Sequence, residues 1–249
     1  MPVQPVSHGR GLRITADTRR ARDLIRAELH RGPHPGGRLP GEHQLMAELH
    51  VSRRAVRGAL ALLREAGAID RLHGVGTVVL EQTETSAIAE TSGVGPAPPG
   101  TLFAGRLRAR VLDDGGLTLP PGVARRLAVP AGSPGRRIDY VALLDEQPLW
   151  VATNYLREPE ADALDAVTFS TDYYAYLADA GVEIARTTLL LEASVADEYD
   201  AELLDVVPGA ALMWGEQVLH GPDGAPFNVA LVRARGDRVA LLSRAHRPA

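Results

Sequence analysis

The stretch HVSRRAVRGALALLREAGAIDRLHGVGTVVL, residues 50–80, decides how the N-terminal part of this chain folds. Ser52 stands where a helix N-cap is expected, and Val51 and Val56 are placed to pack around that cap as a hydrophobic staple. Apolar residues then recur at helical spacing, and Gly67 suits the left-handed conformation that ends many helices. The sequence therefore predicts a sharply started helix that begins after Ser52 and ends before Gly67.

Two helices and a hairpin are predicted around this central helix. Upstream, apolar residues at helical spacing predict helices from Asp17 to His30 and from Glu42 to Leu49, the second followed by a tight turn. Downstream, the β-prone stretches Ala68–Leu72 and Thr77–Leu80 enclose a glycine-rich tip and predict a hairpin. A helix, then a helix-turn-helix, then a hairpin is the order of a winged helix-turn-helix domain.

Basic side chains crowd the first turns of the capped helix. A recognition helix inserts this end into the major groove, where Arg53, Arg54 and Arg57 would fork to guanine or neutralise phosphates. His73 and Gly74 at the hairpin tip are expected to follow the DNA backbone into an adjacent minor groove. The plain alternative is that these arginines form the solvated face of an ordinary helical domain.

Charge divides the chain into two parts. Residues 1–80 carry 13 arginines against 7 acidic residues, a net charge of +6, whereas residues 81–249 carry 14 against 24, a net charge of −10. Nucleic acid would attract the first part and be repelled by the second. Residues 81–101 lack apolar periodicity and are rich in Gly and Pro toward their end, which is typical of a linker. We therefore expect a DNA-binding domain at 1–80, a linker at 81–101 and a second domain at 102–249.

The composition limits the possible classes of protein. The 249 residues are 45% hydrophobic and 23% charged, as in globular chains of two ordinary domains. The absence of cysteine excludes disulfides, thiolate zinc sites and cysteine nucleophiles. No apolar run reaches bilayer length and the first residues lack a signal-peptide core, so we expect a cytoplasmic protein without a membrane partner. Nucleotide-binding, serine-hydrolase and metalloprotease motifs are missing, and we expect no cofactor, no metal and no enzymatic activity.

The second domain mixes strand and helix patterns. Antiparallel strands with a few helices packed on them form an α+β fold. The predicted elements are a hairpin of Arg137–Leu144 and Leu149–Leu156, a helix at Asp172–Ala180, and strands at Thr187–Val195 and Ala211–Leu219.

The N-terminal domain resembles the winged-helix domain of the GntR family of transcription regulators, over most of residues 17–80. The resemblance implies that Ser52, Arg53, Arg57 and Gly74 contact DNA. His43 stands where a DNA-contacting arginine is common, and we include it among the expected contacts. The matching residues are Leu39-Pro40 with Glu42, Val51-Ser52-Arg53, Arg57, Ala59-Leu60, Gly67, Arg71 and Gly74-Val75-Gly76-Thr77.

Residues 102–247 resemble the UTRA ligand-sensing domain of the HutC subfamily of GntR regulators, a fold similar to that of chorismate lyase. The residues on which this resemblance rests are Leu127–Gly132, the Asp145–Pro148 turn, Tyr174 to Leu177 followed by Gly181, Leu203-Leu204 with Gly209, Asp223-Gly224 with Pro226, and Arg235–Arg238.

The departures from that family concern the effector. Members that bind phosphorylated sugars have two arginines where this chain has Tyr140 and Ala142, glutamates where it has Ala152 and Asn228, and a serine where it has Asp172. Because phosphate needs charge-assisted donors, we expect a neutral or cationic, partly apolar effector and not a phosphosugar. Each candidate residue also has an ordinary structural role open to it, as a core side chain or, for Arg235, in an ion pair. The candidate effector-binding residues are Tyr140, Trp150, Asp172, Tyr174, Asn228 and Arg235.

The sequence thus predicts a homodimeric transcription regulator, a repressor whose binding to operator DNA is modulated by a small-molecule effector. Two subunits would pair through their C-terminal domains and present two recognition helices to successive major-groove faces, with the linker as a hinge. Two alternatives stay open. One is a chorismate-lyase-like enzyme joined to a DNA-binding head, and the other is a DNA-binding protein that needs no ligand.

Overall fold

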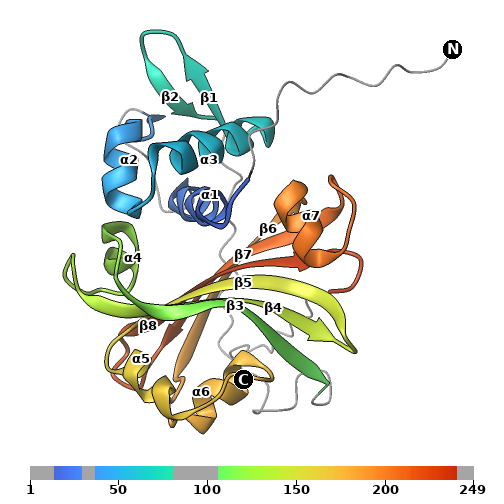
Figure 1. Ribbon diagram of the computed structural model, residues 1–249. Coiled ribbons are helices and arrows are strands. Elements are labelled where there is room, and N and C mark those ends of the chain that lie inside the picture. The colour runs from blue at the N-terminus through green and yellow to red at the C-terminus, as the bar shows by residue number, and fades with distance from the viewer. Residues whose placement is uncertain (1–13, 30–36, 81–105, 240–249) are drawn as a thin grey trace, which may run out of the picture.

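The computed structural model describes residues 14–29, 37–80 and 106–239, in which a small N-terminal head lies against one face of a six-stranded antiparallel sheet (Figure 1). The linker expected at 81–101 lies outside the described residues. None of the helices in the described ranges is long and apolar enough to cross a membrane. The elements of the head are α1 (Ala16–Leu29), α2 (Glu42–Leu49), α3 (Arg53–Glu65), β1 (Ile69–Leu72) and β2 (Gly76–Val79).

The head forms the predicted winged helix-turn-helix. The Ser52 hydroxyl accepts the backbone N–H of Ala55 at 3.3 Å and so caps α3, while Gly67 takes a left-handed φ of +72° just after it. The turn between α2 and α3 passes through His50, also left-handed at φ 51°. Strands β1 and β2 pair antiparallel from Ile69 opposite Val79 to the glycine tip. Local signals in the sequence therefore located every element of the head.

The second domain is built on one sheet with the strand order β3-β4-β5-β8-β7-β6, in which all neighbours are antiparallel. This confirms the α+β prediction. Short helices α4 and α7 lie on the side of the sheet that faces the head, and α5 and α6 lie on the other side (Figure 1). The elements are β3 (Leu107–Thr118), α4 (Pro121–Arg126), β4 (Pro134–Leu144), β5 (Gln147–Arg157), α5 (Glu160–Ala163), η3 (Leu164–Ala166), α6 (Tyr173–Asp179), β6 (Arg186–Val195), α7 (Glu198–Leu204), β7 (Ala211–His220) and β8 (Pro226–Arg235).

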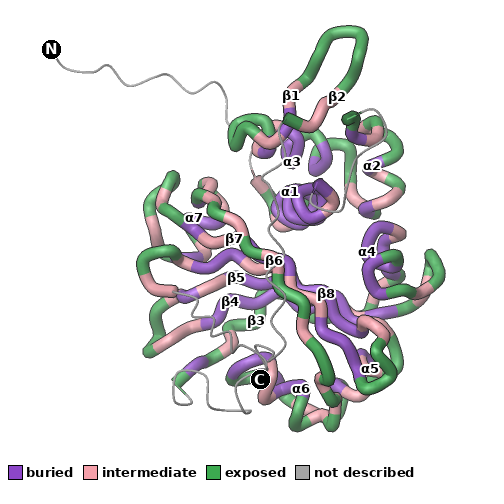
Figure 2. Tube along the Cα trace, turned by 180° about the vertical axis from the view of Figure 1, so that it is seen from behind, coloured by how far each residue is buried: buried purple, intermediate pink, exposed green. Residues whose placement is uncertain are grey.

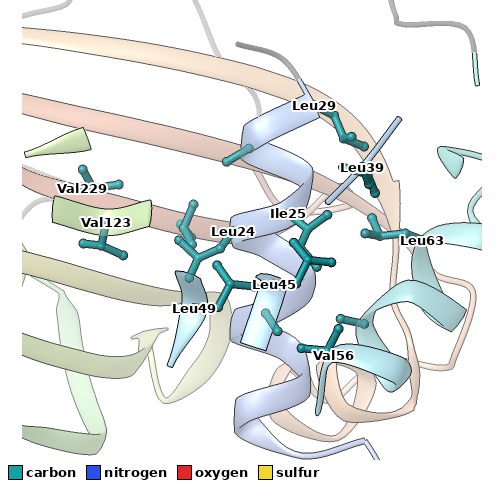
Figure 3. Close-up of a cluster of buried hydrophobic side chains, with 14 of the residues drawn as sticks. Leu24, Ile25, Leu29, Leu39, Leu45, Leu49, Val56, Leu63, Val123 and Val229 are labelled. Carbon is teal, nitrogen blue, oxygen red and sulfur yellow. The ribbon is translucent and has the colours of Figure 1, made fainter. Parts of the chain in front are cut away.

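Helix α1 lies between the rest of the head and the sheet, and eleven of its fourteen residues are buried (Figure 2). A helix buried on all sides belongs to a core and not to a surface. One cluster of buried apolar side chains runs from the head through α1 into the second domain (Figure 3). It includes Leu24, Ile25 and Leu29 of α1, Leu45, Leu49, Val56 and Leu63 of the head, and Val123 and Val229 of the second domain.

The arginines of α1 are buried together with its apolar residues. Arg19 donates through Nη2 to Asp139 Oδ1 on β4 at 3.1 Å and to the Thr153 hydroxyl on β5 at 2.8 Å. Arg20 donates to the other oxygen of the same Asp139 carboxylate at 2.6 Å. One aspartate of the sheet thus holds two arginines of α1.

The centre of this ionic cluster is Asp23 of α1, which is 1% exposed. Arg233 of β8 donates to its Oδ1 from Nη2 at 2.6 Å and from Nε at 3.1 Å. Arg22 donates to the same oxygen at 3.0 Å and also pairs with Asp197 and Asp200 around the start of α7. Burial by itself would raise the pKa of the Asp23 carboxyl, but Arg22 and Arg233 outweigh burial and hold that pKa well below its ordinary value.

This interface corrects the interpretation of the charge distribution. Arg19, Arg20, Arg22 and Arg26 contribute to the excess positive charge of residues 1–80, yet each is buried against acidic groups of the second domain. They are therefore not available to DNA phosphates. The charge difference between the two halves partly reflects pairing between them, because buried ions must be paired and hydrogen-bonded to be tolerated.

Replacing Asp23 with alanine should lower the free energy of unfolding by about 3–5 kcal/mol, because arginines from two domains lose their shared carboxylate in a buried place. The midpoint of urea unfolding measures this loss. The matched control is Asp165→Ala, which removes a carboxylate that is 78% exposed and paired with Arg136. It should cost less than about 1 kcal/mol. Equal, small losses in both variants would contradict a structural role for the cluster.

Candidate functional site

The head carries an exposed groove of about 570 Å³ between α3, the hairpin β1–β2 and the segment that leads into α2. Arg53, Arg57, Arg64 and Arg71 line it. The groove lies on the part of the head that points away from the sheet (Figure 1). Four guanidinium groups around one groove suit a polyanion, because arginine forks to phosphate oxygens and to guanine edges.

The residues predicted to contact DNA are all exposed, and so none of them is needed for the core. Arg53 and Arg57 line the groove one turn apart on α3, and Arg53, whose side chain is 73% exposed, donates from Nε to Glu42 of α2 at 3.1 Å. This contact links the first residue of α3 to the first residue of α2. The exposed set is Ser52, Arg53, Arg54, Arg57, His43, His73 and Gly74.

The structure adds Arg64 and Arg71 to the predicted groove residues. Arg64 lies in the last turn of α3. An arginine at this place in a helix usually points into solvent and has no specific role. The spacing of Arg64, seven residues from Arg57 and eleven from Arg53, places it on the same face of α3, and the hairpin closes the groove beside that face. Arg71 belonged to the family resemblance, but its role as a lining residue needs the three-dimensional position of β1.

A second site is a cavity of about 300 Å³ on the face of the sheet opposite α1. Because side chains alternate along a strand, residues next to those that bind α1 face this cavity. Among the described residues, its lining includes no charged side chain, and the rest of the lining is mainly aliphatic residues of β6, β7 and β8. The aromatic and amide residues of the lining are Tyr140, Trp150, Tyr173, Tyr174, Asn154 and Gln217.

Helix α6 closes one side of this cavity; an N-cap starts it, and two side-chain hydrogen bonds join it to the sheet. Asp172 caps α6 by accepting the N–H of Ala175 at 2.8 Å. The Tyr173 hydroxyl donates to Asn228 Oδ1 at 2.9 Å, and the amide of Gln217 donates to the Tyr174 hydroxyl at 2.8 Å. These bonds bring the side chains of β7, β8 and α6 into one fixed arrangement.

All titratable groups of the cavity are phenols, and burial raises the pKa values of Tyr140, Tyr173 and Tyr174 above the ordinary value of tyrosine. They are therefore neutral at physiological pH. Within the described residues, no three His, Cys, Asp or Glu side chains are placed together as metal ligands.

The structure brings only some of the effector candidates to this cavity. Tyr140, Trp150 and Tyr174 line it, whereas Asp172 and Asn228 support α6 from positions outside the lining. Arg235 lies elsewhere: its guanidinium donates to the Asp237 carboxylate at 3.0 and 2.7 Å. Arg235 thus has the ordinary structural role, in an ion pair, that the sequence left open for it.

Sequence reasoning missed Asn154 and Gln217, the two amides of the cavity. The sequence did contain a signal for Asn154. It is a polar residue in a largely apolar segment of β5, four positions after Trp150, so both side chains lie on the same face of the strand. The sequence contains no comparable signal for Gln217. Its role is seen only when α6 is placed beside β7 in the fold.

Comparison with known proteins agrees with both domains. Residues 17–79 match the gntR family of bacterial regulatory proteins, and residues 104–240 match the UTRA domain. The chain is 29% identical over 238 residues to an HTH-type transcriptional regulator of Rhizobium meliloti, covering 90% of this chain and 92% of that protein. It is 25% identical over 227 residues to the HTH-type transcriptional repressor PhnF of Mycolicibacterium smegmatis, covering 90% and 91%.

The fold is also that of a solved regulator. The crystal structure of PhnF from Mycobacterium smegmatis aligns with a TM-score of 0.56 at 22% identity and covers 92% of this chain and 100% of that one. A winged head with an exposed arginine groove, carried on a ligand-sensing fold, defines the class of DNA-binding transcription regulators. The chain belongs to the gntR family of bacterial regulatory proteins, with a UTRA domain as its C-terminal part.

Replacing Arg53 or Arg57 with alanine should weaken binding to operator DNA by about 1–3 kcal/mol for a lost base contact, or flatten the salt dependence for a lost phosphate contact. Fluorescence anisotropy across a salt series distinguishes the two cases. The matched control is Arg108→Ala, an arginine of β3 that is 70% exposed and paired with Glu146. Affinity and salt dependence near those of the unsubstituted protein in both α3 variants would remove α3 from the DNA interface.

Proposed function

We propose that this chain is a repressor that binds operator DNA through its winged head and changes its affinity when a small molecule occupies the cavity of the UTRA domain. The observation that carries this proposal is that the cavity and the head lie on opposite faces of one sheet. The cavity lies on one face, α1 of the head lies on the other, and the same strands supply residues to both.

Neighbouring residues on these strands join the two faces. Tyr140 lines the cavity and follows Asp139, which holds Arg19 and Arg20 of α1. Asn154 lines the cavity and follows Thr153, which also binds Arg19. A ligand that displaces either strand by a small distance therefore acts on the ionic contacts of the head. Coupling of about 1–3 kcal/mol would change DNA affinity about 5- to 150-fold.

The proposed assembly is a homodimer that pairs through its C-terminal domains. Two heads would then present two copies of α3 to half-sites about one helical turn apart on a near-palindromic operator. A change in the angle of α1 on the sheet would alter the separation of the two recognition helices. The dimer would no longer match the spacing of the half-sites, and transcription would resume.

The two alternatives have less support. A lyase of the chorismate-lyase kind acts on an anionic substrate and would need arginines in the cavity, whereas the described lining carries Tyr140 and uncharged neighbours. A DNA-binding protein without a ligand would not need a cavity lined by a buried amide such as Asn154, which is costly to leave without partners.

The proposal is tested by fluorescence anisotropy of the purified protein on DNA from upstream of its own gene, against a scrambled duplex and across a salt series. We expect sequence-selective binding at least about 10³-fold tighter than to the scrambled duplex, with affinity falling steeply as salt rises. If the operator is not upstream of the gene itself, selection of bound sequences from a random duplex library would identify it. Equal binding of both duplexes together with no enriched sequence would refute the proposal.

A further inference from the structure

The chemistry of the cavity identifies the class of molecule that fits it. Its walls are aromatic on the side of β4, β5 and α6 and aliphatic on the side of β6, β7 and β8. Phosphate or carboxylate groups require charge-assisted donors, and the described lining provides none. A charged ligand would lose its hydration without compensation.

Asn154 is the polar group in this cavity whose hydrogen-bonding capacity is least used. It is 1% exposed, and both its Nδ2 and its Oδ1 lack a hydrogen bond of regular geometry within the described residues. Its amide approaches the Tyr140 hydroxyl closely enough to oppose the effect of burial on the pKa of that phenol. A carboxamide has two donor hydrogens and an acceptor oxygen with two lone pairs, and the approach to Tyr140 uses only part of this capacity. Because buried polar atoms in native proteins are usually paired, the unused capacity at the cavity wall indicates a partner that arrives from outside.

The other polar groups of the cavity are already engaged. The Trp150 side chain is hydrogen-bonded to Tyr140, and Gln217 Nε2 donates to the Tyr174 hydroxyl at 2.8 Å. These contacts hold the aromatic walls in place around Asn154. A carboxamide presents an acceptor and a donor side by side, and its complement is a carbonyl next to an N–H.

We propose that the cavity takes a neutral, largely apolar molecule that carries a lactam or another cis secondary amide, recognised by two hydrogen bonds to Asn154. The lactam N–H donates to Asn154 Oδ1, and the lactam carbonyl accepts from Nδ2. The apolar remainder of the molecule lies against Trp150 and the aliphatic residues of β6 to β8. This inference rests on the proposed function only in treating the cavity as the effector site.

The test uses three probes of the same bicyclic shape with the full-length protein: 2-quinolinone, N-methyl-2-quinolinone and quinoline-2-carboxylate. Isothermal titration measures affinity. The lactam should bind at least about tenfold more tightly than its N-methyl derivative, because methylation removes the donor to Oδ1. It should also bind more tightly than the carboxylate.

Two variants test whether Asn154 is the residue that recognises the lactam. In Asn154→Leu the preference for the lactam over its N-methyl derivative should fall to about twofold or less, because the amide is gone. Met213→Leu, an apolar change in the same lining, should keep the preference. If Asn154→Leu fails to fold, the ranking of the three probes on the unsubstituted protein still decides the question.

Three results would overturn the inference: equal binding of the lactam and its N-methyl derivative, tighter binding of the carboxylate, or no binding of any probe at millimolar concentration. The operator assay, run in parallel, separates this inference from the proposed function. Lactam binding without any change in DNA affinity would support the ligand class and refute effector control, whereas DNA binding without lactam binding would refute the ligand class alone.

Discussion

The ionic contact between Asp23 of α1 and Arg233 of β8 is the interaction on which the arrangement of the two domains depends. It joins the head to a central strand of the sheet at a place from which water is excluded. Around it, Arg22 reaches to the start of α7 and Arg19 reaches to β4 and β5. Helix α1 thus packs against the rest of the winged head and against the UTRA domain.

The apolar and ionic parts of this interface have different effects. Apolar burial of Leu24, Ile25 and their neighbours is favourable but not directional, and so it tolerates several orientations of the head. Guanidinium–carboxylate hydrogen bonds are directional, and an unpaired partner is costly in a buried place. The ion pairs therefore select one orientation among those that the apolar surface allows. A regulator whose output depends on the spacing of two heads needs such a selection.

The sequence predicted the parts of the fold that depend on local signals. The Ser52 cap, the left-handed Gly67 and the glycine hairpin located the recognition helix and wing, because each is set by residues a few positions away. Strand β3 was not delimited, since Asp113-Asp114 and Gly115-Gly116 resemble a turn and become strand only through pairing with β4. Strand β8 was missed for the opposite reason: it is buried on both faces and shows no alternation of polar and apolar residues.

The sites show the same division between local and distant information. The residues predicted to contact DNA follow from the start of α3, the hairpin tip and the family resemblance, and Tyr140 follows from the resemblance too. The buried arginines of α1 resemble any basic helical surface, because their partners Asp139 and Asp200 are more than a hundred residues away. Asn154 differs from an ordinary strand asparagine only in the cavity in front of it and the hydrogen bonds that it lacks.

The central claim is that buried ion pairs hold the head in one orientation on the sheet. Because the chain contains no cysteine, spin labels can be placed at Gln44→Cys on α2 and Glu202→Cys on α7, both exposed positions. Double electron–electron resonance would then measure the distance between head and sheet, in labelled chains diluted with unlabelled protein to suppress signals between subunits. We expect one narrow distance distribution, and a broad one when Arg233→Met is added. A broad distribution in the unsubstituted background, or an unchanged narrow one with Arg233→Met, would contradict the claim.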